Sequence, residues 1–388
     1  MTDPIYLDYA ATTPVDPRVL GVMMPYFNAS FGNPSSVHRY GQRAEAALDS
    51  ARETVASVLH CRPEEIIFTS CGSESDNLAL RGAMMIGLKN NRPWLLTSRT
   101  EHHAVSKTAE QLEKYYGVQV EWLPVDARGA VTPDAMRHAV CDGTALASVM
   151  LANNEIGTIN PIAELAAICH EHGILFHTDA VQAAAYLDVD VTKLGVDMLS
   201  LGSHKFYGPK GVGALYVKKG TQLLPHTTGG GQEFGLRAGT QNVPYIVGFA
   251  EALRLTAQER EERVAHVQPL RDQIIGRVLE EIPDSQLTGH PENRLPNHAS
   301  FVFKDVDGNL LLQLLDAAGF ACSSGSACKT GNPEPSEVIT ALGLSRDWAL
   351  GSLRITLGKD STPEQTDSFL STLPSLVEKT RHLSATDH

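Results

Sequence analysis

Short apolar runs alternate with helical segments through the middle of this 388-residue chain. The runs are typical of buried strands, and the segments between them have the spacing of amphipathic helices. The strand-like runs are IIFTS (66–70), WLLTS (94–98), 118–123, ALASVML (145–151), ILFHTD (174–179) and DMLSL (197–201). The helical segments between them are 73–88, 104–116, 133–140 and 162–172. This alternation predicts an α/β fold with a mainly parallel sheet.

The pattern differs toward both ends of the chain. Residues 1 to about 40 carry prolines at 4, 14, 17, 25 and 34 and are expected to form an extended arm. A long charged helix is expected from Asn242 to Ile282, kinked or broken at Pro269. It is followed by HASFVF (298–303), a helical segment 309–318, SLRITL (352–357) and a helical segment 363–382. Because 388 residues exceed one ordinary core, we expect an arm over 1–14, a large domain over 15–255 and a smaller α+β domain over 256–388.

The composition excludes several classes of function. The formal net charge of −13 argues against nucleic acid and anionic membranes as partners, because both bind basic patches. No apolar run reaches the roughly 20 residues of a membrane helix, and the N-terminus lacks the basic start of a secretory signal. The 6 cysteines form no CxxC pair, and the 15 histidines form no closely spaced ligand set. We therefore expect a cytoplasmic protein without a metal site that acts on a small molecule or a basic protein.

Charged or chemically reactive residues follow the ends of several predicted strands. They are Ser70–Ser73, Glu101-His102, Asn153-Asn154, Asp179 and Lys205. In parallel sheets, ligands bind at the carboxyl ends of the strands. The sequence therefore predicts that these residues form one site.

Lys205 stands in LSLGSHKFYGPKG, directly after a predicted strand. An amine in this position suits a Schiff base with a carbonyl substrate or with pyridoxal phosphate, although a lone lysine is more often a surface residue. Asp179 could pair with the protonated pyridine nitrogen of that cofactor, or it could cap the helix that follows. Gln182 could reach the phenolic oxygen of the same ring. His102 could stack on the ring, or it could be a core histidine.

Two segments offer a cradle for the phosphate of such a cofactor. FTSCGSES (68–75) passes from a strand into a helix N-terminus, where free amides and the helix dipole attract anions. Ser203 and His204 could add side-chain donors. GGGQEFGLRAGTQN (229–242) is a second, glycine-rich candidate that contains Thr240, with a flexible loop as the alternative interpretation.

The distinctive stretch of the second domain is ACSSGSACKTG (321–331), in which small residues surround Cys328. This composition fits a mobile loop with an accessible thiol, and a thiol is strongly nucleophilic even when slightly ionised. Cys322 lies beside an apolar strand and is expected to pack. Metal binding by Cys322 and Cys328 is an alternative, but their spacing matches no common structural zinc site.

These stretches resemble the motifs of cysteine desulfurases of the NifS/IscS-like group, in the class-V aminotransferase family of fold-type I pyridoxal-phosphate enzymes. The matching motifs follow the family order over nearly the whole chain: YLDYAATTP, FGNPSSVH, FTSCGSESDN, TEHHAV, NNEIGT, HTDAVQ, SLGSHKFYGPKG, GGGQEFGLRAGTQN, SSGSAC and SLRIT. The resemblance implies a fold-type I structure with a mainly parallel seven-stranded sheet, pyridoxal 5'-phosphate as cofactor, L-cysteine as substrate and a homodimer.

The resemblance also implies roles by position for the cofactor. Lys205 forms the Schiff base, and His102 stacks on the ring and helps in proton transfer. Contacts with the ring are implied for Asn154, Asp179 and Gln182, of which Asp179 pairs with the pyridine nitrogen. Contacts with the phosphate are implied for Gly72, Ser73, Ser203, His204 and, from the partner subunit, Thr240.

For the substrate, the resemblance implies that Arg354 binds the carboxylate, with Asn154 and Asn33 beside it. Cys328 attacks the substrate sulfur, becomes a persulfide and delivers sulfur to an acceptor protein such as an iron–sulfur scaffold. Cys328 could also ligate an iron–sulfur cluster in transit.

Two positions depart from the family pattern. Cys71 stands where the family usually has glycine, and Lys329-Thr330 replaces the commoner Thr-Ser after the reactive cysteine. Neither change removes a chemical group, although the second leaves the choice of acceptor open. We therefore expect conversion of L-cysteine to L-alanine with transfer of sulfur to Cys328. The alternatives are a selenocysteine lyase, which shares the fold and cofactor, and a non-catalytic sulfur or metal carrier.

Overall fold

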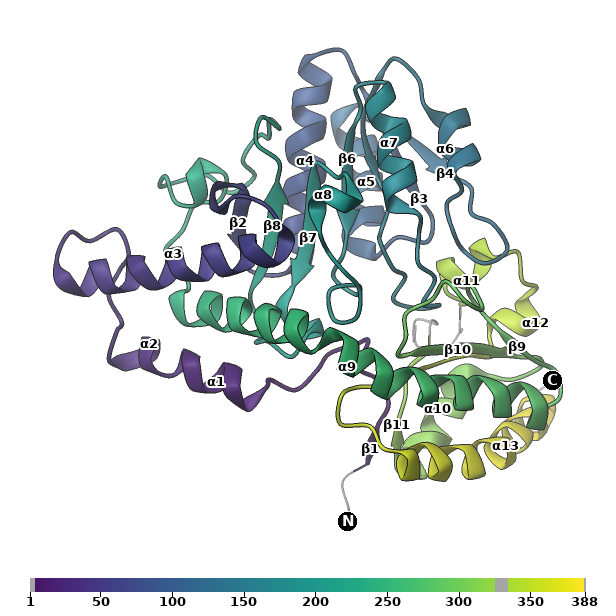
Figure 1. The fold of residues 1–388 in the computed structure, drawn as a ribbon. Coiled ribbons are helices and arrows are strands. Elements are labelled where there is room, and N and C mark those ends of the chain that lie inside the picture. The colour runs from purple at the N-terminus through teal and green to yellow at the C-terminus, as the bar shows by residue number, and fades with distance from the viewer. Residues whose placement is uncertain (1–3, 325–333, 387–388) are drawn as a thin grey trace.

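A seven-stranded sheet forms the centre of the larger part of the molecule (Figure 1). The computed structural model describes residues 4–324 and 334–386. The strand order is β2 (Ile66–Thr69), β8 (Gly213–Val217), β7 (Met198–Gly202), β6 (Leu175–Asp179), β5 (Thr144–Ser148), β3 (Trp94–Ser98) and β4 (Gln119–Leu123). Five of these strands, β7 to β4 in that order, are parallel, whereas β8 is antiparallel to both of its neighbours. The predicted α/β fold with a mainly parallel sheet is confirmed.

Helices cover both faces of this sheet because its strands are apolar on both sides. Leu95 and Leu146 pack with α4 (Gly72–Lys89) and α5 (His103–Tyr116) on one face. The next residue of each strand, Leu96 or Ala147, belongs to the core on the other face. Successive strand residues point to opposite faces, and apolar residues at both positions therefore require helices on both sides. The opposite face packs against α3 (Arg39–Leu59), α6 (Pro133–Ala139), α7 (Ile162–Glu171) and α8 (Val191–Leu194).

The fifth strand is shorter than the sequence predicts. β5 ends at Ser148, whereas the apolar run extends to Leu151. The amides of Val149 and Leu151 still donate to the carbonyls of His177 and Asp179. The backbone then turns, because the Asn153 side chain accepts from the amides two and three residues later, those of Glu155 and Ile156.

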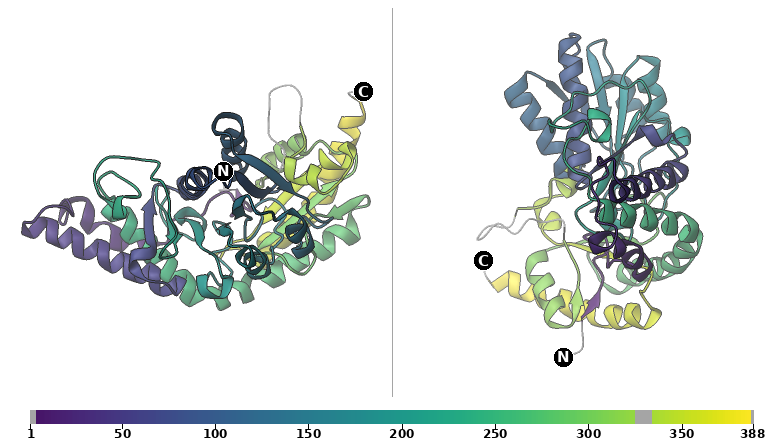
Figure 2. Two further views of the ribbon diagram at one scale, coloured as in Figure 1. Left: turned by 90° about the horizontal axis from the view of Figure 1, so that it is seen from above. Right: turned by 90° about the vertical axis from the view of Figure 1, so that its left-hand side faces the viewer.

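A second, smaller sheet lies beside the first at the lower right of Figure 1. Its antiparallel strands are β9 (Ser285–Leu287), β10 (His298–Phe303) and β12 (Ser352–Thr356), with β10 in the middle. The surrounding helices are α10 (Gly308–Ala317), α11 (Glu337–Ala341), α12 (Arg346–Ala349) and α13 (Pro363–Thr386). α3 and α13 lie at opposite ends of the molecule (Figure 2). β1 (Ile5–Tyr6) pairs in parallel with β11 (Phe320–Ala321), so the N-terminus lies against this smaller part.

One helix runs past both sheets. α9 (Val243–Glu281) is 39 residues long and is continuous through Pro269, so the helix is not broken there. It packs against α1, α3 and α13, which lie in different parts of the molecule. The predicted domain boundary at residue 255 falls inside this helix and stays a prediction. No helix within residues 4–324 and 334–386 is long and apolar enough to cross a bilayer.

The N-terminal region is not extended throughout, which corrects the expectation of an arm over residues 1 to about 40. Residues 17–28 form two short helices, α1 (Pro17–Met23) and α2 (Pro25–Asn28). The side chain of Asp16 accepts from the Arg18 amide and caps α1, and a proline follows at the first helical position. Proline is favourable there because the first amide of a helix has no intrahelical acceptor. The same residues that indicate turns in the sequence therefore start these helices.

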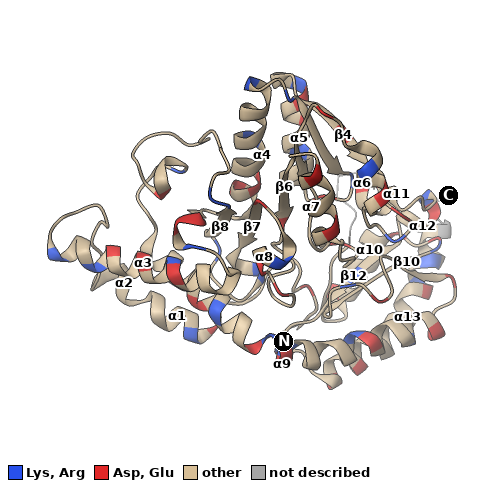
Figure 3. Ribbon diagram, turned by 45° about the horizontal axis from the view of Figure 1, so that its top comes forward, with Lys and Arg blue, Asp and Glu red and all other residues tan. Residues whose placement is uncertain are grey.

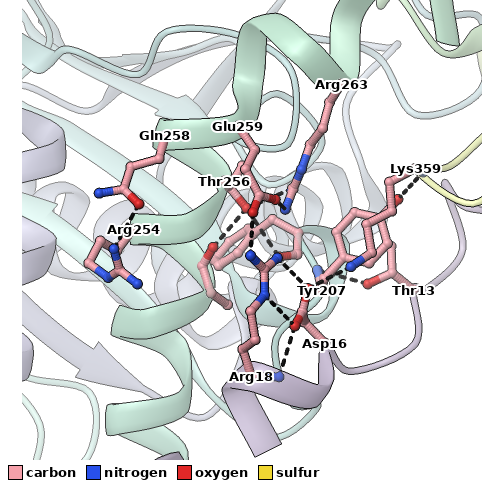
Figure 4. Close-up of polar contacts among 12 residues, drawn as sticks. Thr13, Asp16, Arg18, Tyr207, Arg254, Thr256, Gln258, Glu259, Arg263 and Lys359 are labelled. Carbon is pink, nitrogen blue, oxygen red and sulfur yellow. Dashed lines mark hydrogen bonds and ion pairs between the residues drawn. The ribbon is translucent and has the colours of Figure 1, made fainter. Parts of the chain in front are cut away.

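A cluster of charged side chains joins α1, α9 and the segment after β12 (Figure 4). Asp16 is buried and pairs with Arg18 at 2.8 Å and with Lys359 at 2.5 Å. These cations hold the pKa of the Asp16 carboxyl well below its usual range. Arg18 also contacts Glu259 of α9 at 2.5 Å. Elsewhere acidic and basic residues are interspersed, for example along α13 (Figure 3).

Candidate functional site

A cavity of about 330 Å³ lies where the carboxyl ends of the parallel strands face the N-terminal residues and β12. Most of the predicted site residues line it. They are Gly72, Ser73, His102, Asn154, Asp179, Gln182, His204, Lys205 and Arg354. The remaining lining residues are Ala10, Ala11, Cys71, Asp76, Met150 and Val181. The structure therefore places residues from β2–α4, β3–α5, β5, β6, β7 and β12 around one space.

Lys205 enters the cavity from the short turn Ser203–Lys205 that follows β7. Its Nζ donates to the backbone carbonyls of Ala10 at 2.6 Å and Ala11 at 2.8 Å. Burial and, secondly, the positive charge of Arg354 lower its pKa to about 8. A substantial fraction of this amine is therefore neutral near neutral pH, which is the form that attacks a carbonyl.

Asp179 is the last residue of β6 and both sequence interpretations describe part of its environment. Its Oδ1 accepts from the Val181 amide at 2.8 Å, as a capping carboxylate does, although a turn and not an α-helix follows. The side chain also lines the cavity. Burial raises its pKa, while His102 and Lys205 favour the charged form. A cation placed in the cavity would stabilise the Asp179 carboxylate further.

His102 is the N-cap of α5 and its Nδ1 accepts from the Ala104 amide at 3.1 Å. Burial lowers the pKa of this imidazole, and the nearby charge of Asp179 partly opposes that shift. The hydrogen bond at Nδ1 assigns the proton of the neutral ring to Nε2. His102 and Asn154 also line a second cavity of about 410 Å³ that extends to Pro335 and Glu337.

Arg354 reaches the cavity from the middle of β12, where it stands opposite Ser300 of β10. Its NH2 nitrogen donates to Asp8 Oδ1 at 2.6 Å and its NH1 nitrogen to the Asn154 carbonyl at 3.0 Å. The Nε atom is buried without a hydrogen-bond partner within the described residues. Arg354 therefore retains N–H donors for a further acceptor.

Three predicted site residues do not line this cavity, and a fourth is not among the described residues. Thr240 is exposed and Asn33 is exposed with its Oδ1 accepting from the Ser35 amide, and neither lines the cavity of this chain. Ser203 is fully buried, and its Oγ has no partner among the described residues. Cys328 lies outside the described residues. Burial raises the pKa of the Cys322 thiol, and that side chain packs against the core, as expected.

The glycine-rich stretch 229–242 is anchored to the larger part at two points. Glu233 is buried and pairs with Arg52 at 2.8 Å, and it also accepts from the Phe68 amide. Arg237 pairs with Glu74 in the first turn of α4 at 2.9 Å. These contacts fix the middle of a stretch for which a flexible loop was the alternative interpretation.

Two further buried acids, Asp76 and Glu101, interact electrostatically with Asp179, and of these the sequence patterns missed Asp76. Burial and the charge of Asp179 raise the pKa of Asp76, and burial raises the pKa of Glu101 to about 8. His177, in the middle of β6, lies 3.7 Å from Asp76 Oδ1, and its ring nitrogens are 2.9 Å from Ser148 Oγ and Ser200 Oγ. Asp8 was missed as well, although it stands inside the YLDYAATTP motif. The only signal for it was a charged residue within an otherwise apolar and small-residue stretch.

The donor set of the cavity fits a phosphorylated pyridine aldehyde. The N-cap Cys71 makes no side-chain hydrogen bond to α4, so the first amides of that helix stay available beside Gly72 and Ser73 for an anion. Lys205 supplies an amine and Asp179 a buried carboxyl to the same cavity. Amine, buried carboxyl and anion cradle are the three groups that such a cofactor requires.

Comparisons with known proteins agree with this geometry. Residues 5–369 match the model of the aminotransferase class-V family. The chain is 45% identical to the cysteine desulfurase IscS of Dictyoglomus turgidum over 98% of its length and 96% of that protein. It is 46% identical to the cysteine desulfurase IscS of Methanosarcina thermophila over 98% of its length and 93% of that protein.

Solved structures are similar over nearly the whole chain. A NifS-like protein superposes with a TM-score of 0.90 at 38% identity, covering 97% of this chain and 100% of that one. The protein SspA, solved in complex with cysteine, superposes with a TM-score of 0.80 at 36% identity, covering 92% of this chain and 100% of that one. The chain therefore belongs to the class-V aminotransferase family and, within it, to the IscS/NifS-like cysteine desulfurases.

Proposed function

We propose that this protein is a cysteine desulfurase that converts L-cysteine to L-alanine and transfers the sulfur to Cys328. One observation carries the proposal: Lys205, Asp179 and Arg354 line a single cavity. An amine and a buried carboxyl suit pyridoxal 5'-phosphate, and a guanidinium on the far side suits the carboxylate of an amino acid. The 43–46% identity to cysteine desulfurases named IscS supports L-cysteine as that amino acid.

We assign the residues that would hold the cofactor from the family resemblance, which the shared cavity supports. Lys205 would bind its aldehyde, Asp179 its pyridine nitrogen and Gln182 its phenolic oxygen, while His102 covers the ring. Gly72, Ser73 and His204 would hold its phosphate, with Ser203 beneath them and Thr240 supplied by the second subunit of a homodimer. When bound, pyridoxal phosphate supplies an electron-withdrawing ring that stabilises negative charge at the substrate α-carbon.

The chain's own residues then divide the work. Arg354 binds the substrate carboxylate and so fixes the amino acid in the cavity, with Asn154 beside it. The expected contribution of Asn33, which does not line the cavity of this chain, stays a prediction. His102 Nε2 is free to hold or donate a proton, because Nδ1 is occupied by the Ala104 amide. The Lys205 amine, which lines the same cavity, would provide a second group that holds or moves a proton there.

Sulfur transfer requires a thiolate, and we assign that role to Cys328. The Cys328 thiolate attacks the substrate sulfur, an S–S bond forms, and the C–S bond breaks with its electron pair left on the substrate carbon. Protonation of that carbon gives L-alanine, and Cys328 carries the persulfide. Ser323 pairs with Arg354 through two backbone hydrogen bonds, and Pro335 lines the second cavity.

The persulfide is proposed to pass to an acceptor protein such as an iron–sulfur scaffold.

A cysteine turnover assay tests the activity. Wild type with pyridoxal phosphate should release L-alanine and, with a reductant, sulfide. Cys328→Ala should keep the yellow cofactor colour and lose sulfide release, whereas Cys141→Ala, which removes an exposed cysteine elsewhere, should match wild type. Full activity in Cys328→Ala would overturn the assignment of the nucleophile.

A further inference from the structure

Arg354 shares its guanidinium with a carboxylate of the protein itself. Asp8 Oδ1 lies 2.6 Å from Arg354 NH2, and the two side chains are only 18% and 9% exposed. The Asn154 carbonyl occupies the NH1 nitrogen, and the buried Nε has no partner within the described residues. The arginine proposed to bind the substrate carboxylate thus lines the cavity while it is already paired with Asp8, and its buried Nε makes no hydrogen bond within the described residues.

Asp8 is held in place by the small sheet. Residues 7–16 form a connector between the two parts of the molecule. Its Leu7 carbonyl accepts from the Thr356 amide at 2.8 Å, and its Ala10 amide donates to Thr356 Oγ1 at 2.9 Å. The Asp8 carbonyl closes a turn by accepting from the Ala11 amide at 3.0 Å. Both sides of Asp8 are therefore fixed to β12, the strand that carries Arg354.

The far end of the connector is fixed to the segment around Lys205. Thr13 Oγ1 donates to the His204 carbonyl at 3.0 Å and accepts from the Tyr207 amide at 2.9 Å. Asp16 accepts from Lys359 Nζ and receives two further bonds from Arg18 (Figure 4). A segment anchored at both ends does not swing away when a ligand enters, so Asp8 stays beside Arg354 during binding.

We propose that Asp8 is a positioning residue that both orients Arg354 and weakens its affinity for the substrate carboxylate. This inference rests on the proposed function, in which Arg354 binds that carboxylate. The hydrogen bond from NH2 fixes the plane of the guanidinium. The charge of Asp8 repels a second carboxylate on the same cation, because two anions a few ångströms apart in a partly buried site interact more strongly than in water.

The two effects are separable by one substitution. Asp8→Asn keeps an oxygen that can accept from Arg354 NH2 but removes the negative charge. It should therefore bind carboxylates more tightly, by about five- to tenfold, which corresponds to about 1–1.4 kcal/mol. If Asp8 did nothing but orient Arg354, the same change would leave carboxylate affinity equal or weaker. The KM for L-cysteine should fall in the same variant without a matching rise in kcat.

Propionate is the probe, because it has a carboxylate but neither the amine nor the thiol that turnover needs. Its dissociation constant is measured by calorimetry on the full-length protein loaded with pyridoxal phosphate. Asp188→Asn is the control, since it removes the same charge from a surface cluster with Lys193 and Arg260. Arg354→Ala should abolish propionate binding and so place the ligand at that arginine.

Tighter propionate binding in Asp8→Asn alone supports the proposal. Unchanged or weaker binding in Asp8→Asn, equal tightening in Asp188→Asn, or unaltered binding in Arg354→Ala overturns it. If Asp8→Asn does not fold, Asp8→Ser carries the same prediction, because its hydroxyl is also neutral. Failure of the proposed desulfurase function would appear separately, as wild type that produces no L-alanine from L-cysteine.

Discussion

The two sides of the central cavity are built in different ways. Asp179 ends a strand of the large sheet and His102 and Lys205 follow neighbouring parts of it, so the common edge at which its parallel strands end places all three. Arg354 comes from a different sheet, and its contacts come from Asp8 near the N-terminus and from the Asn154 backbone. We call Lys205, Asp179 and His102 the cofactor side of the cavity, and the order of strands along the chain determines their positions. The carboxylate side, which consists of Arg354 and its two partners, depends on segments about 200 to 350 residues apart in the sequence. One of these segments is the connector, which contains Asp8.

The largest expected effect is on the cofactor side. Lys205→Ala should remove the yellow colour of the loaded protein and lower L-cysteine turnover by at least about a thousandfold, because a nucleophilic group is lost. Absorbance spectra and an alanine assay measure both. Lys210→Ala, an exposed lysine in the same turn region, is the matched control and should behave as wild type. A coloured, active Lys205→Ala protein would contradict the account of this side.

On the carboxylate side, Arg354→Lys should raise the KM for L-cysteine by about ten- to a hundredfold and change kcat less. A lysine keeps the positive charge but lacks the planar fork that binds Asp8, the Asn154 carbonyl and a substrate carboxylate together. Steady-state kinetics over a range of L-cysteine concentrations separates the two constants. A fall in kcat at constant KM would place Arg354 in the chemical step instead.

The difference between the two sides explains what could be predicted from sequence. The alternation of apolar runs and helices predicts the sheet, and hence that Asp179 and Lys205 meet at its edge. Arg354 was assigned only through resemblance, because no local pattern places the middle of β12 opposite β7. Asp8, Asp76 and the Ala10 and Ala11 carbonyls were missed for the same reason. Their contacts arise from tertiary packing that leaves no periodic signal.

The sequence also failed to predict the short N-terminal helices, for a related reason. The prolines at 17 and 25 indicate turns by composition, yet each stands at the first position of a helix. The packing of α1 and α2 on α9 supports these helices in addition to the local capping, and composition does not reveal that packing. Similarly, Pro269 does not break α9, because the helix is held by buried contacts on both sides of it, from Phe249 to Val278.

The pKa of Lys205 gives a third prediction, for the protein without cofactor. With a pKa of about 8, the neutral amine rises from roughly a tenth at pH 7 to roughly nine tenths at pH 9. The rate of pyridoxal phosphate uptake, followed by visible absorbance, should therefore increase by about tenfold over that range. A rate that stays flat or falls with pH would show that the burial of Lys205 beside Arg354 does not control its reactivity.

The smallest effect is expected at the connector. Lys359→Met should lower the free energy of unfolding by about 1–2 kcal/mol, because buried Asp16 loses one of its two cations but keeps Arg18. Urea denaturation measures the change. Lys193→Met is the control, since its ion pairs are at the surface and contribute little. Equal stability of both variants would mean that the contact in Figure 4 does not secure the connector.

The central claim is that both sides of the cavity act on one molecule of L-cysteine and deliver its sulfur to Cys328. Intact-mass spectrometry after one equivalent of L-cysteine, without reductant, tests this most directly. The account predicts one added sulfur atom on wild type, absent in Cys328→Ala, together with one equivalent of L-alanine. L-alanine formed with no sulfur on Cys328, or sulfur retained equally by Cys328→Ala, would contradict it.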